Sequence, residues 1–158
     1  MIEVPNVDQP KKLRELILTC PAFLSDDFIP SKYTCDGENI SPPLHIEQIP
    51  KDAKCFALIV DDIDAPGGSF VHWVAWNIPI KHTLHENEVH GIEGRNDEGQ
   101  QGYTGPCPPN GLHRYYFKIY ALDDFLQLPP ETNKDQLLKA MEEYAIAYGE
   151  LIGLYERQ

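Results

Sequence analysis

Apolar residues recur along three stretches of the chain with the spacing of β-strands. Residues 55–60 form an unbroken apolar run, which is typical of a strand buried on both faces. Residues 70–78 and 113–122 alternate, so each predicts a strand with two distinct faces. In the second of these strands one face carries Phe70, His72, Val74, Trp76 and Ile78. In the third strand one face carries His113, Tyr115, Phe117, Ile119 and Ala121. Weaker strands are expected near residues 16–20 and 151–155.

One helix is predicted, and it begins after Pro129-Pro130. Asn133 can cap its N-terminus, and Gln136 three residues later completes a capping box. Residues at helical spacing follow, namely Leu137, Met141, Tyr144 and Tyr148. Gly149 stands where a C-terminal cap is common, so the helix is expected to extend to it. Many strands and one late helix predict a β-sandwich with peripheral helical decoration.

Length and charge narrow the class of protein. A chain of 158 residues suits one domain (1–158), in which residues 1–15 are expected to be extended or flexible. Its 13 basic and 25 acidic residues give a net charge of −12, which argues against nucleic-acid binding and against attachment to anionic lipid. Residues 1–21 carry no signal-peptide pattern, and no stretch approaches the roughly 18 apolar residues of a membrane span. We therefore expect a soluble, cytoplasmic protein.

Four cysteines, Cys20, Cys35, Cys55 and Cys107, are scattered without a CxxC pair. This spacing excludes a zinc knuckle and a thioredoxin-like motif. In a reducing cytosol the default expectation is free thiols, most of them buried. A disulfide remains open, because spacing alone does not assign one.

The first segment with candidate chemistry follows the apolar strand directly and contains Asp61, Asp62 and Asp64. Asp61 and Asp64 are expected to cap the Ala-Pro-Gly-Gly turn through side-chain hydrogen bonds. For Asp62 the choice between capping and a functional site stays open.

The second segment is the glycine-rich stretch 91–111, which predicts one long, ordered surface loop. Its Pro108-Pro109 corner leads into the strand that opens with His113 and Tyr115. A single strand histidine is most often structural, but His72 and His113 on inward-facing positions, near a carboxylate, favour a site. The remaining histidines lie in polar sequence and are expected to be solvated: His45, His82, His85 and His90.

These residues resemble the signatures of the phosphatidylethanolamine-binding protein family, in its bacterial and archaeal Raf-kinase-inhibitor-like branch. Residues 60–68 and 71–79 are similar to the first signature, and residues 105–115 to the second. Residues 33–44 and 149–155 are similar to the same branch, so the resemblance runs from about Leu16 to Tyr155.

The resemblance implies an all-β, Greek-key antiparallel β-sandwich with one or two short peripheral helices and a small anion pocket at one end. It assigns ligand binding to Asp62, His72, Cys107 through its main-chain N–H, Pro108, Pro109, His113 and Tyr115. A homodimer is a further expectation from the resemblance. The C-terminal helix with a pocket-closing tyrosine, known from eukaryotic members, has no match here, so kinase inhibition is poorly supported.

Three functional classes follow. The leading one is a non-catalytic binding protein for a phosphorylated small molecule, a phospholipid head group or a phosphorylated side chain, without catalytic residue, cofactor or resident metal. The alternatives are an inhibitor or regulator of a kinase or peptidase, and a metal-dependent enzyme using two histidines and one aspartate. Imidazoles, a phenol and an amide supply donors without lysine or arginine, and Asp62 is expected to keep one histidine cationic. Anion affinity is therefore predicted to rise as the pH falls from about 8 to about 6.

Overall fold

The computed structural model describes residues 12–157, and most of its elements are strands. The sequence predicts an extended or flexible segment over residues 1–15. Residues 1–11 of that segment lie outside the described residues. In chain order the elements are β1 (Arg14–Glu15), β2 (Ile17–Thr19), β3 (Asp27–Phe28), the 3-10 helix η1 (Ser31–Tyr33), β4 (Leu44–Glu47), β5 (Cys55–Asp62), β6 (Phe70–Pro79), β7 (Thr83–Leu84), β8 (Ile92–Glu93), β9 (His113–Leu122), α1 (Lys134–Ala140) and β10 (Ala145–Tyr155).

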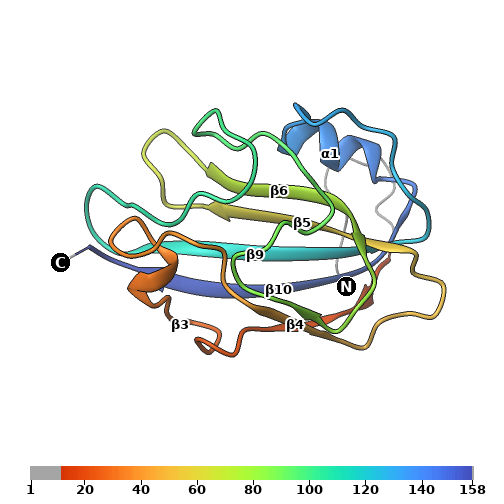
Figure 1. Cartoon of the computed structure of the whole chain (residues 1–158), viewed down its shortest axis with the longest axis horizontal. Helices are drawn as coiled ribbons and strands as arrows, with labels where there is room; N and C mark the ends of the chain where they lie inside the picture. Colours follow the sequence, from red (N-terminus) through yellow and green to blue (C-terminus); the bar gives the residue numbers. More distant parts are fainter. Residues whose placement is uncertain (1–11, 158) are drawn as a thin grey trace.

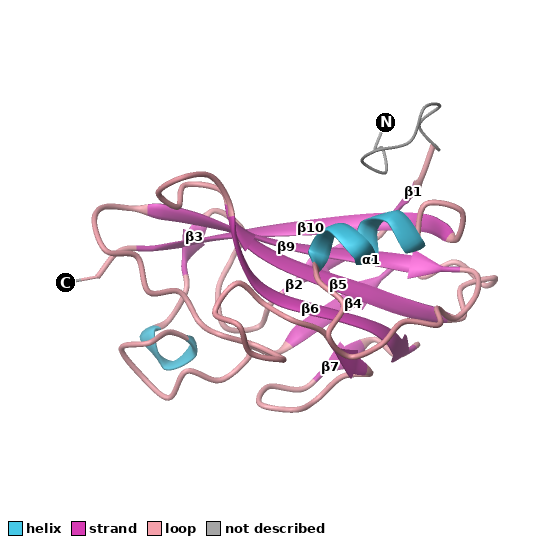
Figure 2. Cartoon of the chain, turned by 90° about the horizontal axis from the view of Figure 1, so that it is seen from above, coloured by secondary structure: helices cyan, strands magenta, loops and turns pink. Residues whose placement is uncertain are grey.

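The strands form two sheets, with α1 lying over the larger one (Figures 1 and 2). The larger sheet has the order β1-β10-β9-β5-β6-β8, and β3 also pairs with β10; the smaller sheet has the order β2-β4-β7. The long strands β10, β9, β5 and β6 are antiparallel neighbours, but β1 and β3 both run parallel to β10. The larger sheet is therefore mixed, and the expectation of a purely antiparallel arrangement is wrong. Two-residue strands carry no pattern from which their direction follows. The Greek-key connection stays a prediction.

Two apolar layers hold these elements together. The larger layer joins both sheets, and it includes Phe56, Trp73 and Phe117 from the larger sheet and Leu44 and Leu84 from the smaller. The second layer lies on the other face of the larger sheet, where α1 packs. It includes Ile59, Val74, Trp76, Leu137 and Met141. At about 25 cal/mol per Å² of buried apolar surface, side chains of this size each stabilise the fold by roughly 1.5–3 kcal/mol.

All three of the predicted main strands form, and β9 has the predicted bounds. Its alternation also holds, because Tyr115, Phe117 and Ile119 enter the layer between the sheets, whereas Tyr120 faces the layer under α1. In β6 the predicted alternation is wrong at His72 and at Ile78, which packs in the layer between the sheets and not with Val74 and Trp76. Trp73 pairs with Val60 and Val71 with Asp61, so His72 is an extra residue at a β-bulge. The bulge separates His72 from the face that Val74 and Trp76 share.

The predicted helix begins where expected but ends early. Asn133 accepts from the Gln136 N–H, and the Gln136 side chain accepts from the Asn133 N–H, which confirms the capping box. The helix ends at Ala140, however, and the chain enters β10 at Ala145. Tyr148, predicted on the helix, is a strand residue whose ring lies 4.9 Å from that of Tyr120. Pairing along the full length of β9 outweighs a continued helix.

No helix in the described part of the chain is long and apolar enough to span a membrane.

Candidate functional site

Three central strands bring candidate residues to one end of the larger sheet. Asp62 is the last residue of β5, His113 is the first of β9, and Asp62 pairs in register with both Phe70 and Tyr115. His72 follows two residues into β6. In an antiparallel pair, one strand ends at the edge of the sheet where its neighbour begins. Asp62 and His113, which are 51 residues apart in sequence, therefore lie side by side.

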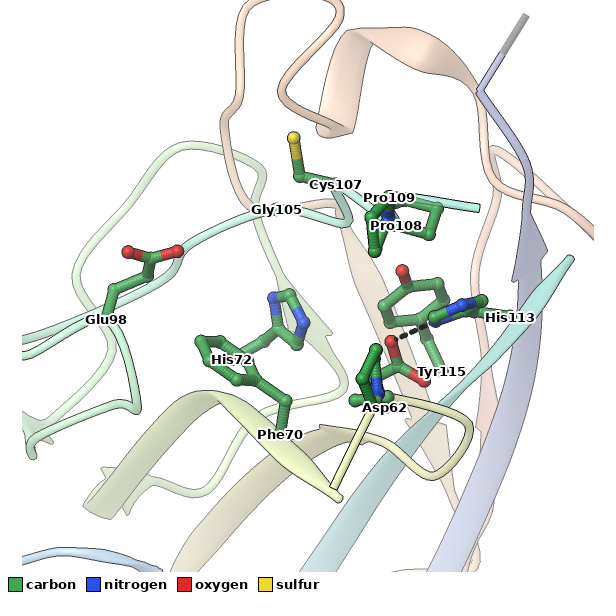
Figure 3. Close-up of a pocket in the computed structure, with 12 residues that line it drawn as sticks. Asp62, Phe70, His72, Glu98, Gly105, Cys107, Pro108, Pro109, His113 and Tyr115 are labelled. Carbon is green, nitrogen blue, oxygen red and sulfur yellow. Dashed lines mark hydrogen bonds and ion pairs between the residues drawn. The ribbon is translucent and has the colours of Figure 1, made fainter. Parts of the chain in front are cut away.

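A cavity of about 170 Å³ opens among these side chains (Figure 3). A cavity needs only about 10–15 Å³ of such volume to hold one water, so this cavity has room for a phosphate-sized group. The residues that line it are Asp62, Ala65, Pro66, Phe70, His72, Glu98, Gly105, Cys107, Pro108, Pro109, His113 and Tyr115. All seven residues to which the sequence assigned ligand binding are therefore gathered around one cavity.

Asp62 and His113 form a buried pair. The Nδ1 of His113 lies 2.6 Å from the Asp62 carboxylate, and both side chains are almost fully enclosed. The Nε2 of His113 lies 3.0 Å from the carbonyl oxygen of Asn110. Because a carboxylate and a carbonyl can only accept, the doubly protonated ring satisfies both contacts. His113 thus brings positive charge to the cavity wall while its N–H groups point to protein acceptors.

Asp62 also contacts the backbone of the segment that follows β5. Its second carboxylate oxygen accepts from the Asp64 N–H at 2.8 Å. Asp64 instead forms a two-point ion pair with the Arg114 guanidinium, which lowers the pKa of Asp64. Asp61 is buried on the opposite face of the sheet and pairs with Lys118 and Lys134. The predicted turn-capping roles of Asp61 and Asp64 are wrong: Asp62 accepts from the backbone just before the Ala-Pro-Gly-Gly turn, and the Gly68 N–H donates to the Ala65 carbonyl oxygen within it.

The bulge turns His72 toward the cavity, and a loop holds its ring there. The Nδ1 of His72 donates to the carbonyl oxygen of Thr104 at 2.7 Å. The ring also makes edge contacts with Phe70 and Tyr115, at centroid distances of 5.1 and 5.3 Å. Burial lowers the pKa of His72 below its usual 6.5, and burial outweighs the opposing effects of the Thr104 carbonyl and Asp62. His72 is therefore neutral at neutral pH.

Tyr115 offers a hydrogen-bond donor that the protein leaves unused. Its side chain is fully buried, yet its hydroxyl has no hydrogen-bond partner within residues 12–157. In Figure 3 the hydroxyl points toward the Pro108 turn across the cavity. Burial first, then the charge of the nearby Asp62 carboxylate and its acceptor oxygens, raise the pKa of Tyr115 above its usual 10, so the phenol keeps its proton, although no contact of the hydroxyl with the described residues has hydrogen-bond geometry. Buried hydroxyl groups without a partner are rare in proteins, which makes this group a candidate ligand contact.

The proline-rich turn presents one further donor. Pro106, Pro108 and Pro109 lack an N–H, and the Gly105 N–H donates to the Asn39 side chain at 2.8 Å. The Cys107 N–H makes no backbone hydrogen bond among the described residues, so it is the free amide of this turn. Figure 3 shows the Cys107 sulfur directed away from the cavity.

That sulfur is bonded to Cys35, and this corrects the expectation of four free thiols. Cys35 and Cys107 form a disulfide across 72 residues of sequence, whereas Cys20 and Cys55 are free and buried. The Cys35 N–H also donates to the Pro106 carbonyl oxygen at 3.1 Å. The bond fastens the turn that carries the Cys107 amide to the segment after η1.

Several lining residues were not predicted. Phe70 shares its predicted face with His72, so the alternation of β6 could have identified it. Glu98 and Gly105 lie in the glycine-rich loop, where no periodic pattern marks an inward residue. Thr104, which fixes the His72 ring, acts through its backbone carbonyl, and any residue type could supply that group.

Fold and site together define a strand-rich protein with a small polar pocket at one end of its main sheet. The chain belongs to the phosphatidylethanolamine-binding protein family, whose sequence model matches residues 19–156. This confirms the resemblance of the signature residues.

Relatives and solved structures agree with that assignment. A UPF0098 protein of Pyrococcus abyssi is 48% identical over 155 residues, covering 91% of this chain and 87% of the relative. A putative phosphatidylethanolamine-binding protein homologue from Chlamydia trachomatis superposes with a TM-score of 0.88 at 41% identity, covering 92% of this chain and 99% of that one. The Escherichia coli protein YbcL, described as a member of the mammalian family, superposes with a TM-score of 0.83 at 28% identity, covering 91% and 99%.

Proposed function

We propose that this protein is a non-catalytic binding protein whose pocket holds a phosphate-type anion. The observation that carries the proposal is the buried Tyr115 hydroxyl, which faces the cavity without a protein partner. The Cys107 amide, which makes no backbone hydrogen bond among the described residues, is a second candidate donor, and the hydrogen-bonded Asp62–His113 pair lines the same cavity. Hydrogen bonds from fixed donors to an anion are stronger than those between neutral groups.

Inorganic phosphate is the probe for this proposal, and Tyr115→Phe is the deciding variant. The hydroxyl has no protein partner, so its removal breaks no internal hydrogen bond and should leave the fold intact. Titration calorimetry should show phosphate binding to the native protein and affinity weakened about tenfold or more in the variant, because a hydrogen bond to a charged group is lost. Tyr116→Phe, on the same strand but the opposite face, is the matched control and should bind normally. No binding by the native protein, or equal affinity in the Tyr115 variant, would refute the proposal.

The absence of catalysis is part of the proposal. The pocket lining contains no serine or threonine, and its one cysteine is held in a disulfide. The metal-dependent alternative gains no support from the geometry. Both ring nitrogens of His113 already donate to protein acceptors, and residues 12–157 hold no cluster of three metal-ligating side chains. No contact within the described chain specifically favours the kinase or peptidase regulator.

Location and assembly are secondary parts of the proposal. The homodimer expected from the resemblance stays a prediction. We propose a cytoplasmic location. The Cys35–Cys107 disulfide would be unusual there, because cytosolic disulfides are rare except in organisms such as hyperthermophilic archaea. Cell fractionation combined with alkylation of free thiols tests location and the Cys35–Cys107 bond together.

A further inference from the structure

The hydrogen bond that fixes His72 leaves one ring nitrogen for a ligand. Its Nδ1 must carry a proton, because the Thr104 carbonyl oxygen 2.7 Å away can only accept. The Thr104 N–H in turn donates to the His72 carbonyl oxygen at 3.0 Å, so backbone and side chain fix the same contact. In a neutral ring with a proton on Nδ1, Nε2 bears a lone pair and accepts. Figure 3 shows the His72 ring at the cavity, with one of its nitrogens on the side of Asp62 and Tyr115.

Burial keeps His72 neutral against the charged groups around it. Asp62 and Asp61 on β5 and Glu98 in the glycine-rich loop favour the charged ring, but burial, which lowers the pKa of His72, is the larger effect. From β9, His113 and Tyr115 face the same space, and His113 is already paired with Asp62. His72 is only 6% exposed, so solvent does little to stabilise a charge there.

Apart from the exposed Glu98 carboxylate, the free groups that line the pocket comprise two donors and one acceptor. The donors are the Tyr115 hydroxyl and the Cys107 amide, and the acceptor is Nε2 of His72. His113 adds charge but no free N–H, because Asp62 and the Asn110 carbonyl occupy both its nitrogens. An oxyanion that retains one hydroxyl group matches this set. Its charged oxygens accept from the two donors, and its hydroxyl donates to His72.

We propose that the pocket selects phosphate monoesters over phosphate diesters, because a bound monoester retains a proton that it shares with Nε2 of His72. This inference rests on the proposed function and narrows its ligand class. A diester has no P–OH group, so one of its oxygens would face the lone pair of Nε2. To bind, it must leave this contact unmade or bring a proton onto a buried ring.

The proton has a defined origin. The second pKa of a phosphate monoester is about 6, so at a pH of about 7.5 most free monoester is the dianion. Forming the complex therefore takes up close to one proton from the buffer per ligand, and this proton lies between the phosphate oxygen and Nε2. No covalent bond to phosphorus forms or breaks.

Methyl phosphate and dimethyl phosphate are matched probes for this selectivity. Calorimetry at a pH of about 7.5, in two buffers of different ionisation enthalpy, gives both affinity and proton uptake. We expect methyl phosphate to bind at least about tenfold more tightly, with uptake of close to one proton. Equal affinities, or methyl phosphate binding without proton uptake, would overturn the inference while leaving the anion pocket standing. Failure of both probes and of inorganic phosphate to bind would overturn the proposed function itself.

His72→Gln separates the proton from the shape of the pocket. An amide can present an N–H to either anion without taking up a proton. The variant should bind both probes within about threefold of each other, and proton uptake should disappear. His85→Gln removes an exposed histidine outside the pocket lining and should keep the native preference and uptake. A His72 variant that binds and still prefers the monoester with proton uptake would contradict the assignment. The comparison of the two probes on the native protein tests the inference even without the variant.

Discussion

Asp62 joins the pocket to the turn that follows β5. One carboxylate oxygen accepts from the Asp64 N–H and the other from His113, while the side chain remains almost fully buried. A buried carboxylate is stable only when it is paired and hydrogen-bonded, and both conditions are met here. The charge of His113 and the shape of the turn that carries Ala65 and Pro66 therefore depend on one residue.

His72 and His90 make stability depend on pH. The expectation that His90 is solvated is wrong, because its side chain is buried and its Nε2 lies 3.0 Å from the His85 carbonyl oxygen. Burial lowers the pKa of each below 6.5 in the folded protein, so the unfolded chain binds more protons as the pH falls through that value. The free energy of unfolding should therefore decrease below a pH of about 6.5, by at most about 1.4 kcal/mol per pH unit for each histidine. Urea unfolding at pH values between about 7.5 and 5.5 measures this decrease in the free energy of unfolding. The window lies above the pH range in which exposed carboxylates titrate.

The histidine variants show which group is responsible. His72→Gln and His90→Gln should each flatten the slope, whereas His85→Gln should not, because no buried ring is changed. Added phosphate should restore part of the stability lost at low pH, since it binds only the folded protein. A pH-independent free energy of unfolding in the native protein would contradict this account.

The position of His72 also marks a limit of prediction at the residue scale. Strict alternation in residues 70–78 predicts a shared face with Val74 and Trp76, which lie in the apolar layer under α1. The extra residue opposite β5 reverses the alternation between Val71 and Trp73. A bulge depends on how two strands pair, so the pattern of one strand cannot reveal it. The resemblance to a known family identified His72 where periodicity could not orient it.

At the scale of elements, the sequence predicts how a segment begins better than how it ends. Asn133 and Gln136 start α1 through local hydrogen bonds that need no other part of the chain. Tyr144 and Tyr148 are four residues apart, an even interval that suits a strand face as well as a helix face. Pairing with β9 settles the choice, and it involves residues that the helix pattern does not contain. The disulfide likewise follows from the arrangement of two distant loops.

That disulfide gives a prediction for the proline-rich turn. The disulfide closes a loop of 72 residues and so restricts the conformational freedom of the unfolded chain. Opening it should therefore lower the free energy of unfolding by about 2–4 kcal/mol, either by reduction or in the double variant Cys35→Ser, Cys107→Ser. Phosphate affinity should fall only a few-fold, because the Gly105 and Cys35 amides still hold the turn. Chemical denaturation and calorimetry with and without a reductant measure both effects.

A reductant should have no further effect on the double variant, which provides the control. The free cysteines, Cys20 and Cys55, are buried and unchanged by it. Native protein whose stability is insensitive to reduction, with the bond shown to be open, would contradict a stabilising role for the disulfide.

At the scale of the whole molecule, local and global electrostatics oppose each other. The chain carries a net charge of −12, which repels free anions at long range. The pocket attracts them only at short range, through the Tyr115 hydroxyl and the Cys107 amide, which make no hydrogen bond to the described part of the chain. Selectivity therefore has to come from the geometry of a few hydrogen bonds, because the overall field gives no preference for any phosphate compound.

This opposition predicts that the protein does not associate with anionic membranes. Vesicles of phosphatidylcholine and phosphatidylserine present a negative surface, and their head groups are phosphate diesters. Both the net charge of −12 and the acceptor at His72 disfavour contact, so sedimentation should leave the protein in the supernatant at low salt and at about 0.15 M salt. Retention that weakens with salt would mean that a basic surface governs binding. Retention that methyl phosphate displaces, and that Tyr115→Phe abolishes, would mean that the pocket accepts a diester head group in a bilayer, and the preference for monoesters would then be wrong.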